Sequence, residues 1–75
     1  MKTLKDCQKD SQVKILKLHA PTELKQRLIS FGIMKNAIVK ILEHAPTKSN
    51  IEIKVGNMRI ALRGEEADMI EVAVL

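Results

Sequence analysis

The residues of this chain best suited to chemistry are one cysteine and two histidines, Cys7, His19 and His44. A thiolate and two imidazoles are ligands that Zn²⁺ and similar metal ions prefer. Their spacing matches no zinc motif, however, and a closed structural zinc site usually has four protein ligands. We therefore expect no metal site, and we place both histidines at the solvent-exposed ends of strands.

The residue types needed for catalysis are present, but not in a catalytic arrangement. None of the serines lies in a nucleophile-elbow motif, and neither histidine has a clear acid partner. The glycines are isolated turn residues rather than a phosphate-binding loop. Because no nucleophile, base and orienting group occur together, we predict that the chain is not an enzyme and uses no cofactor or small-molecule substrate.

Charge is distributed unevenly along the chain. Residues 1–40 contain nine Lys or Arg against three acids, and residues 41–75 contain four against six. The basic half could steer an acidic partner, although charges that only solvate strand and helix faces would give the same count. Among the acids of the second half, Glu65, Glu66 and Asp68 cluster at one turn. A solvated helix start is the favoured interpretation of that cluster, and binding of a hard metal ion is the alternative.

The single cysteine closes no internal disulfide, which favours a reducing cytoplasm. No apolar run approaches the ~20 residues of a membrane span, and the N-terminus has no apolar signal segment. We expect one cytoplasmic domain over residues 1–75, without direct membrane insertion.

Apolar spacing predicts the elements that must position any site. Period-two and β-branched patterns predict five strands, and one helical pattern follows the first of them. The predicted strands are Gln12–His19, Ala37–His44, Asn50–Val55, Met58–Arg63 and Ile70–Leu75, and the predicted helix is Glu23–Phe31. Residues 45–50 form a loop, and residues 64–69 form a loop or a single helical turn.

The helix and the turns supply the clearest structural residues. Leu24, Leu28 and Phe31 fall on one helical stripe and are predicted to enter the core. From the strands, Ile53, Ile60 and Leu62 join them. The predicted turn residues, which all tolerate positive φ, are Gly32 at the helix end, Asn36 after it, and Gly56 with Asn57 in a two-residue hairpin.

Five short antiparallel strands in 75 residues avoid free edges best by closing on themselves. The strand Ala37–His44 has apolar residues on both faces, as in a barrel covered by a helix. The predicted fold is therefore mainly β: a small SH3-like five-stranded barrel with a short α-helix inserted after the first strand.

Two apolar residues do not fit the core pattern. Ile29 lies off the helical stripe, and Met34 follows in the turn. Single exposed apolar residues are common and need no explanation. With Arg27 and Lys35 beside them, however, they could form a docking patch, so we predict a partner-binding surface at Arg27, Ile29, Met34 and Lys35.

Three segments together resemble the FeoA family: "RLISFGI", "VKILEHAP" and "IEIKVGNMRIALRGEEADMIEV". The similarity runs from about Leu4 to Val72. The family pattern L-x-x-M-G-[LI]-x-x-G has two departures here, because Phe31 holds the Met position and Asn36 the second Gly. An SH3-like domain of the same kind occurs in metal-dependent regulators of the diphtheria-toxin-repressor type.

The resemblance implies a cytoplasmic accessory protein of ferrous iron uptake. Its partner would be a FeoB-type membrane transporter, contacted at the cytoplasmic GTP-binding region. The alternative hypothesis is a basic small barrel that binds nucleic acid. That alternative is less favoured because such barrels usually stack bases on aromatic residues, and Phe31 is the single aromatic residue of the chain.

Overall fold

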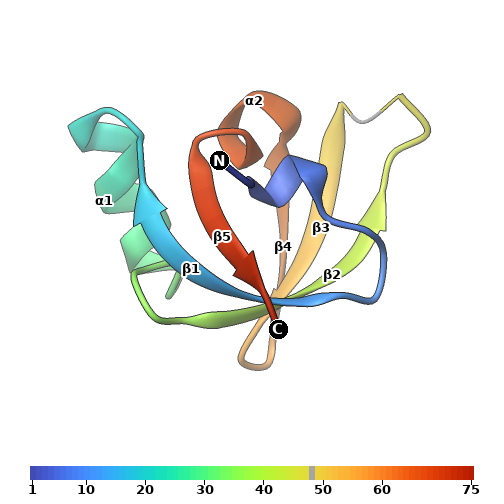
Figure 1. The fold of residues 1–75 in the computed structure, drawn as a ribbon. Coiled ribbons are helices and arrows are strands. Elements are labelled where there is room, and N and C mark those ends of the chain that lie inside the picture. The colour runs from blue at the N-terminus through green and yellow to red at the C-terminus, as the bar shows by residue number, and fades with distance from the viewer. Residues whose placement is uncertain (48) are drawn as a thin grey trace.

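The computed structural model describes residues 1–47 and 49–75. The predicted loop over 45–50 thus includes Lys48, which lies outside the described residues. A five-stranded sheet carries two α-helices and one 3₁₀ turn (Figure 1). In chain order the elements are η1 Leu4–Asp6, β1 Gln12–Leu18, α1 Thr22–Ser30, β2 Ile38–His44, β3 Asn50–Val55, β4 Met58–Arg63, α2 Gly64–Ala67 and β5 Ile70–Val74.

The sheet has the order β4-β3-β2-β1-β5, and all neighbouring strands are antiparallel. It curves strongly (Figure 1) but does not close, because β4 and β5 form no ladder. The mainly-β fold with a helix after the first strand is confirmed, whereas a closed barrel is not observed. The outer edge of β5 already pairs with the N-terminal segment, since Val72 N–H donates to Lys2 O at 2.9 Å and Thr3 bridges to Glu71.

The concave side of the sheet holds an almost purely aliphatic core. Of the predicted core residues, Leu28, Ile53 and Leu62 are buried, and Leu24 and Ile60 are half-buried and pack against them. The second apolar face predicted for residues 37–44 is not covered, because Ile38 is exposed. Beyond these residues the core contains Leu4, Val13, Ile15, Ile33, Val39, Ile41, Ile51, Ile70 and Val72.

Phe31 is 38% exposed, so the prediction that it enters the core is wrong. The regular helix ends at Ser30, and Phe31 is its C-cap residue. Gly32 then takes φ +88°, and the chain reverses. Gly32 N–H donates to Ile29 O at 2.9 Å and Ile33 N–H donates to Leu28 O at 3.0 Å, which is the Schellman pattern. This reversal brings Ile33, rather than Phe31, into the core beside Leu28.

Replacing Gly32 tests how far this reversal depends on glycine. Gly32→Ala should lower the free energy of unfolding by about 1–2 kcal/mol, because a left-handed φ is costly for a residue with a Cβ. A Cβ at this position would also lie 3.3 Å from Val55 Cγ1. Gly32→Asn would meet the same contact but tolerates positive φ better, so it should lose less in urea denaturation. Equal losses would assign the effect to Val55 instead of the backbone.

The other predicted turn residues divide into two groups. Asn36 has φ +72° and Gly56 has φ +58°, as their residue types suggested. Asn57 is not among the residues with positive φ, so only the first central residue of the β3–β4 hairpin is left-handed. That pattern is the one of a type II′ turn, in which glycine at the first position is sufficient.

Within the described residues, no helix is long and apolar enough to cross a membrane.

Candidate partner-binding site

A groove of about 580 Å³ runs between α1 and β1. Its lining comes from β1, from α1 and from the turn that follows α1. We call it the α1–β1 groove, and its lining residues are Leu16, Lys17, Leu18, Lys25, Ile29, Met34 and Lys35. In Figure 1, α1 lies beside β1 at one side of the molecule. Consistent with this position, Leu28 is its one buried residue.

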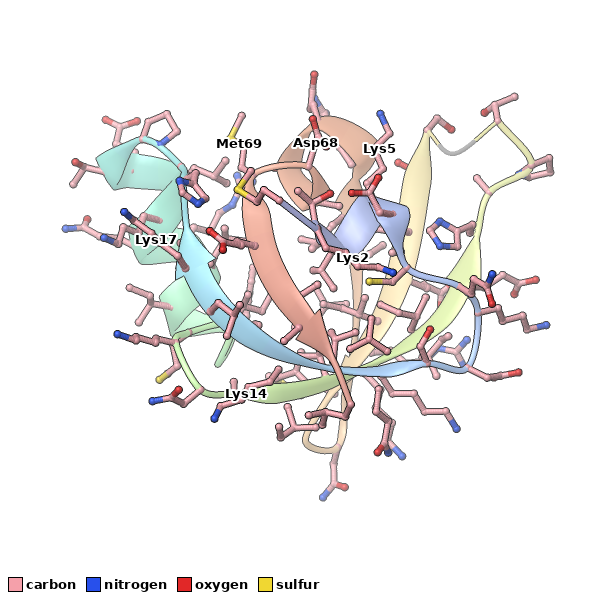
Figure 2. The ribbon with its side chains drawn as sticks, in the orientation of Figure 1. Lys2, Lys5, Lys14, Lys17, Asp68 and Met69 are labelled. Atoms are coloured by element: carbon pink, nitrogen blue, oxygen red, sulfur yellow. The ribbon has the colours of Figure 1, made fainter. Side chains whose placement is uncertain are left out.

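A β-bulge in β1 places Leu16 at the groove. Ile15 pairs with Val72 and Lys17 pairs with the adjacent Glu71, so Leu16 is an extra residue between them. Strict alternation would place Lys17 in the core with Ile15, and the bulge instead shifts the phase so that Leu18 is buried. Leu16 and Lys17 therefore both face outward, and Lys17 projects away from the sheet interior in Figure 2.

The outer face of α1 forms the opposite wall of the groove. Lys25 and Ile29 are four residues apart and hence share one side of the helix. Ile29 is 40% exposed, whereas its neighbour Leu28 is fully buried. The helical wheel thus separated these two residues correctly.

The turn after α1 supplies the third side. Ala37 N–H donates to Met34 O at 3.0 Å, and Asn36 is left-handed at the third position, as in a type II turn. Two hydrogen bonds join this turn to β1: Asn36 N–H to Ile15 O at 2.7 Å, and Ile15 N–H to Ala37 O at 2.9 Å. Met34, 42% exposed, is therefore held on a fixed backbone.

Three of the four residues predicted to contact a partner, namely Ile29, Met34 and Lys35, line this groove together. Arg27 does not line it. Its guanidinium donates to Glu66 Oε2 at 2.5 Å and so joins α1 to α2. Glu66 also accepts the backbone N–H of Arg63, at 3.0 Å. The structure thus gives Arg27 a partner within the chain.

The residues suited to metal or acid–base chemistry are dispersed. His19 Nε2 lies 2.7 Å from Glu71 Oε1, so the interpretation that it has no acid partner is wrong. His44 Nε2 contacts Cys7 O at 2.5 Å, and Cys7 Sγ donates to Thr3 O at 3.3 Å. Burial raises the pKa of the Cys7 thiol, and the charge of Lys2 partly opposes that shift. Across residues 1–47 and 49–75, no three His, Cys, Asp or Glu side chains form a metal-binding group.

Sequence reasoning did not identify Leu16, Lys17 and Lys25 as members of the site. One signal was present in the strand itself. Lys14 and Lys17 are three residues apart, and a regular strand would place them on opposite faces. If both are to reach solvent, the strand needs an extra residue between them, which is the observed bulge.

A curved five-stranded antiparallel sheet with a helix after its first strand is the SH3-like arrangement, and here it bears an apolar groove bordered by lysines. The chain belongs to the FeoA family, since the FeoA domain model matches residues 2–74. A protein of Campylobacter jejuni, provisionally named Fe(2+) transport protein A, is 33% identical over 73 residues, covering 97% of this chain and 99% of that protein. A Helicobacter pylori protein of the same name is 28% identical over 71 residues, covering 93% of each.

Solved structures share the fold closely. Iron(II) transport protein A from Clostridium thermocellum has a TM-score of 0.92 and 32% identity, and the match covers 99% of this chain but 46% of that one. FeoA from Chlorobium tepidum has a TM-score of 0.92 at 26% identity, with 99% and 70% covered. A manganese-dependent transcriptional repressor has a TM-score of 0.89 at 18% identity, covering 97% and 40%, and this likeness shows the fold alone.

Proposed function

We propose that this chain is a non-enzymatic cytoplasmic accessory protein of ferrous iron transport. It docks through the α1–β1 groove on the cytoplasmic GTP-binding region of a FeoB-type transporter. Membership of the FeoA family supports the accessory role in ferrous iron transport. The observation that supports docking is the gathering of Leu16, Ile29 and Met34, each between 36% and 42% exposed, in one concave surface.

The arrangement of the polar residues favours binding over catalysis. A catalytic site needs a nucleophile or base, an orienting group and a place for the reacting atom within a few ångströms of one another. In the described part of the chain, His19 contacts Glu71 at one end of β1, and His44 contacts Cys7 O at one end of β2. Neither pair lies in the α1–β1 groove.

Nucleic-acid binding remains the weaker hypothesis, although the exposure of Phe31 removes one argument against it. Phe31 is half-exposed rather than buried, so it could stack on a base. Surfaces that bind single strands usually combine several aromatic residues with a basic groove. This chain has no Tyr or Trp, and Phe31 does not line the groove that contains the lysines. Docking on a protein therefore accounts better for the apolar lining.

Capture from the native cell tests the proposed function. The tagged chain is isolated with the membranes solubilised by mild detergent, and the proteins that accompany it are identified by mass spectrometry. We expect the FeoB-type transporter to be enriched over a sample prepared with an unrelated tagged domain. A transporter that is present in the membranes but not enriched would contradict the proposal. Enrichment of RNA or DNA at moderate salt would favour the alternative.

A further inference from the structure

The α1–β1 groove contains lysines as well as the three apolar residues that support the proposed function, and the two kinds are regularly distributed. Each of its three sides contributes one exposed apolar residue and one exposed lysine. The pairs are Leu16 with Lys17 on β1, Ile29 with Lys25 on α1, and Met34 with Lys35 on the turn. All six residues line the groove, and we refer to the three apolar ones as its floor and to the three lysines as its border.

The three lysines are electrostatically unsatisfied. Within the described residues every arginine forms an ion pair, whereas none of the lysines does. Lys17, Lys25 and Lys35 differ from the other lysines in that they line one groove together. The acid beside Lys17 across the β1–β5 ladder is Glu71, and its carboxylate contacts His19 instead. The groove therefore has a positive border that nothing on this surface neutralises, and a negatively charged partner would be attracted to it.

Size and shape restrict what can bind. From α1, Lys25 and Ile29 line the groove, and their spacing of four residues corresponds to ~6 Å along the helix axis. The concavity of the groove suits a few inserted side chains better than a flat bilayer surface. The lysines of the border are complementary to carboxylates, and the apolar residues of the floor are complementary to aliphatic or aromatic side chains. A short peptide segment carrying both kinds on one face meets these requirements, as in helix-in-groove recognition.

We propose that the α1–β1 groove binds a short acidic amphipathic segment of a protein partner. Its apolar side chains contact Leu16, Ile29 and Met34, and its carboxylates pair with Lys17, Lys25 and Lys35. That this segment belongs to the FeoB-type transporter rests on the proposed function. The chemistry of the segment rests on the groove alone.

Three labelled peptides of about twelve residues test the chemistry. The first has leucines at helical spacing with glutamates between them, the second has lysine for each glutamate, and the third has serine for each leucine. Fluorescence anisotropy should show binding of the first peptide to the intact chain and at least about tenfold weaker binding of the other two. Equal binding of the lysine peptide, or no binding of the acidic peptide at millimolar concentration, would overturn the proposal.

Charge-reversal variants locate the binding. Lys25→Glu and Lys35→Glu should each weaken the acidic peptide about tenfold, because they reverse the border charge. Lys54→Glu changes net charge equally but lies on β3, outside the groove, so it should leave the affinity within about twofold. A loss as large in Lys54→Glu would show that net charge, not the groove, attracts the peptide, and would overturn the assignment.

Vesicle binding and capture from the native cell distinguish a protein partner from a lipid surface, and this inference from the proposed function. In separate measurements, we expect the chain to bind the acidic peptide and not to be retained by phosphatidylglycerol vesicles. Retention by vesicles without peptide binding would overturn the proposal in favour of a lipid surface. If the peptide fails but the transporter is captured, this inference is wrong and the proposed function stands. If the peptide binds but the transporter is not captured, the proposed function is wrong and the groove chemistry stands.

Discussion

Leu28→Ala should lower the free energy of unfolding by about 2–5 kcal/mol, the usual cost of deleting a large buried side chain. Leu28 is fully buried, and it is the one residue of α1 that is. Its carbonyl also accepts the hydrogen bond from Ile33 that completes the end of the helix. The substitution leaves this backbone bond in place but removes the main side-chain packing of α1 on the core. A helix of nine residues is not stable alone, so α1 should unfold or separate from β1.

Urea denaturation, followed by circular dichroism, measures this effect. Leu24→Ala is the matched control, because Leu24 is on the same stripe but only half-buried, and it should lose clearly less. Because a domain of this size has little stability to spare, Leu28→Ala could be unfolded before urea is added. Leu28→Met, which conserves volume, should then fold and lose under ~1.5 kcal/mol. A loss below ~1 kcal/mol in folded Leu28→Ala would contradict the role assigned to Leu28.

Ile29→Glu changes the adjacent residue and should have the opposite effect: the stability of the fold is kept and the affinity for the partner is lost. Because Ile29 is 40% exposed, the substitution should change the free energy of unfolding by no more than ~0.5 kcal/mol. It places a carboxylate on the apolar floor of the groove, where it would repel an acidic partner and remove an apolar contact. We expect the affinity for the transporter's cytoplasmic region to fall at least about thirtyfold, the effect of an interface hot spot.

Met58→Glu is the control for this second prediction. Met58 is 49% exposed and lies at the β3–β4 hairpin, outside the groove. Both variants replace an apolar side chain with glutamate at a comparable exposed fraction. Calorimetry should show wild-type affinity for Met58→Glu. If both variants, or neither, lose affinity while remaining folded, the α1–β1 groove is not the docking surface.

The strands and the main turns could be predicted because each depends on a local pattern. The clean alternation of residues 50–55 and 58–63 requires no knowledge of the rest of the chain. Gly32 and Asn36 similarly mark left-handed positions by residue type alone. The open sheet could not be predicted in this way. The outer edge of β5 pairs with Lys2, a contact between residues about seventy positions apart that no local pattern indicates.

Phe31 shows how a correct local pattern can give a wrong side-chain position. The stripe Leu24–Leu28–Phe31 assumes that the helix continues through Phe31, but it ends one residue earlier. The reversal at Gly32 then moves Ile33 into the place that the stripe assigned to Phe31. Helix ends are uncertain by one or two residues in any sequence-based assignment, and here one residue decides which side chain is buried.

The candidate site could be predicted only in part, for a related reason. Ile29, Met34 and Lys35 are close in sequence, so a helical wheel and a turn were sufficient to group them. Leu16 and Lys17 belong to a different element and face outward only because of the β1 bulge. Arg27 was grouped with the site by sequence proximity, but its partner Glu66 is 39 positions away. Long-range pairs of this kind are invisible to periodicity.

Three of the four methionines serve as reporters in the most direct test of docking through the α1–β1 groove. The chain is labelled with ¹³C at the Met methyl groups and titrated with the cytoplasmic region of the FeoB-type transporter. Met34 lines the α1–β1 groove, whereas Met58 lies at the hairpin and Met69 precedes β5. We predict that the Met34 methyl resonance shifts or broadens first, and that the Met58 and Met69 resonances stay unchanged. Perturbation of Met58 or Met69 with Met34 unaffected, or no perturbation at saturating transporter, would contradict this prediction.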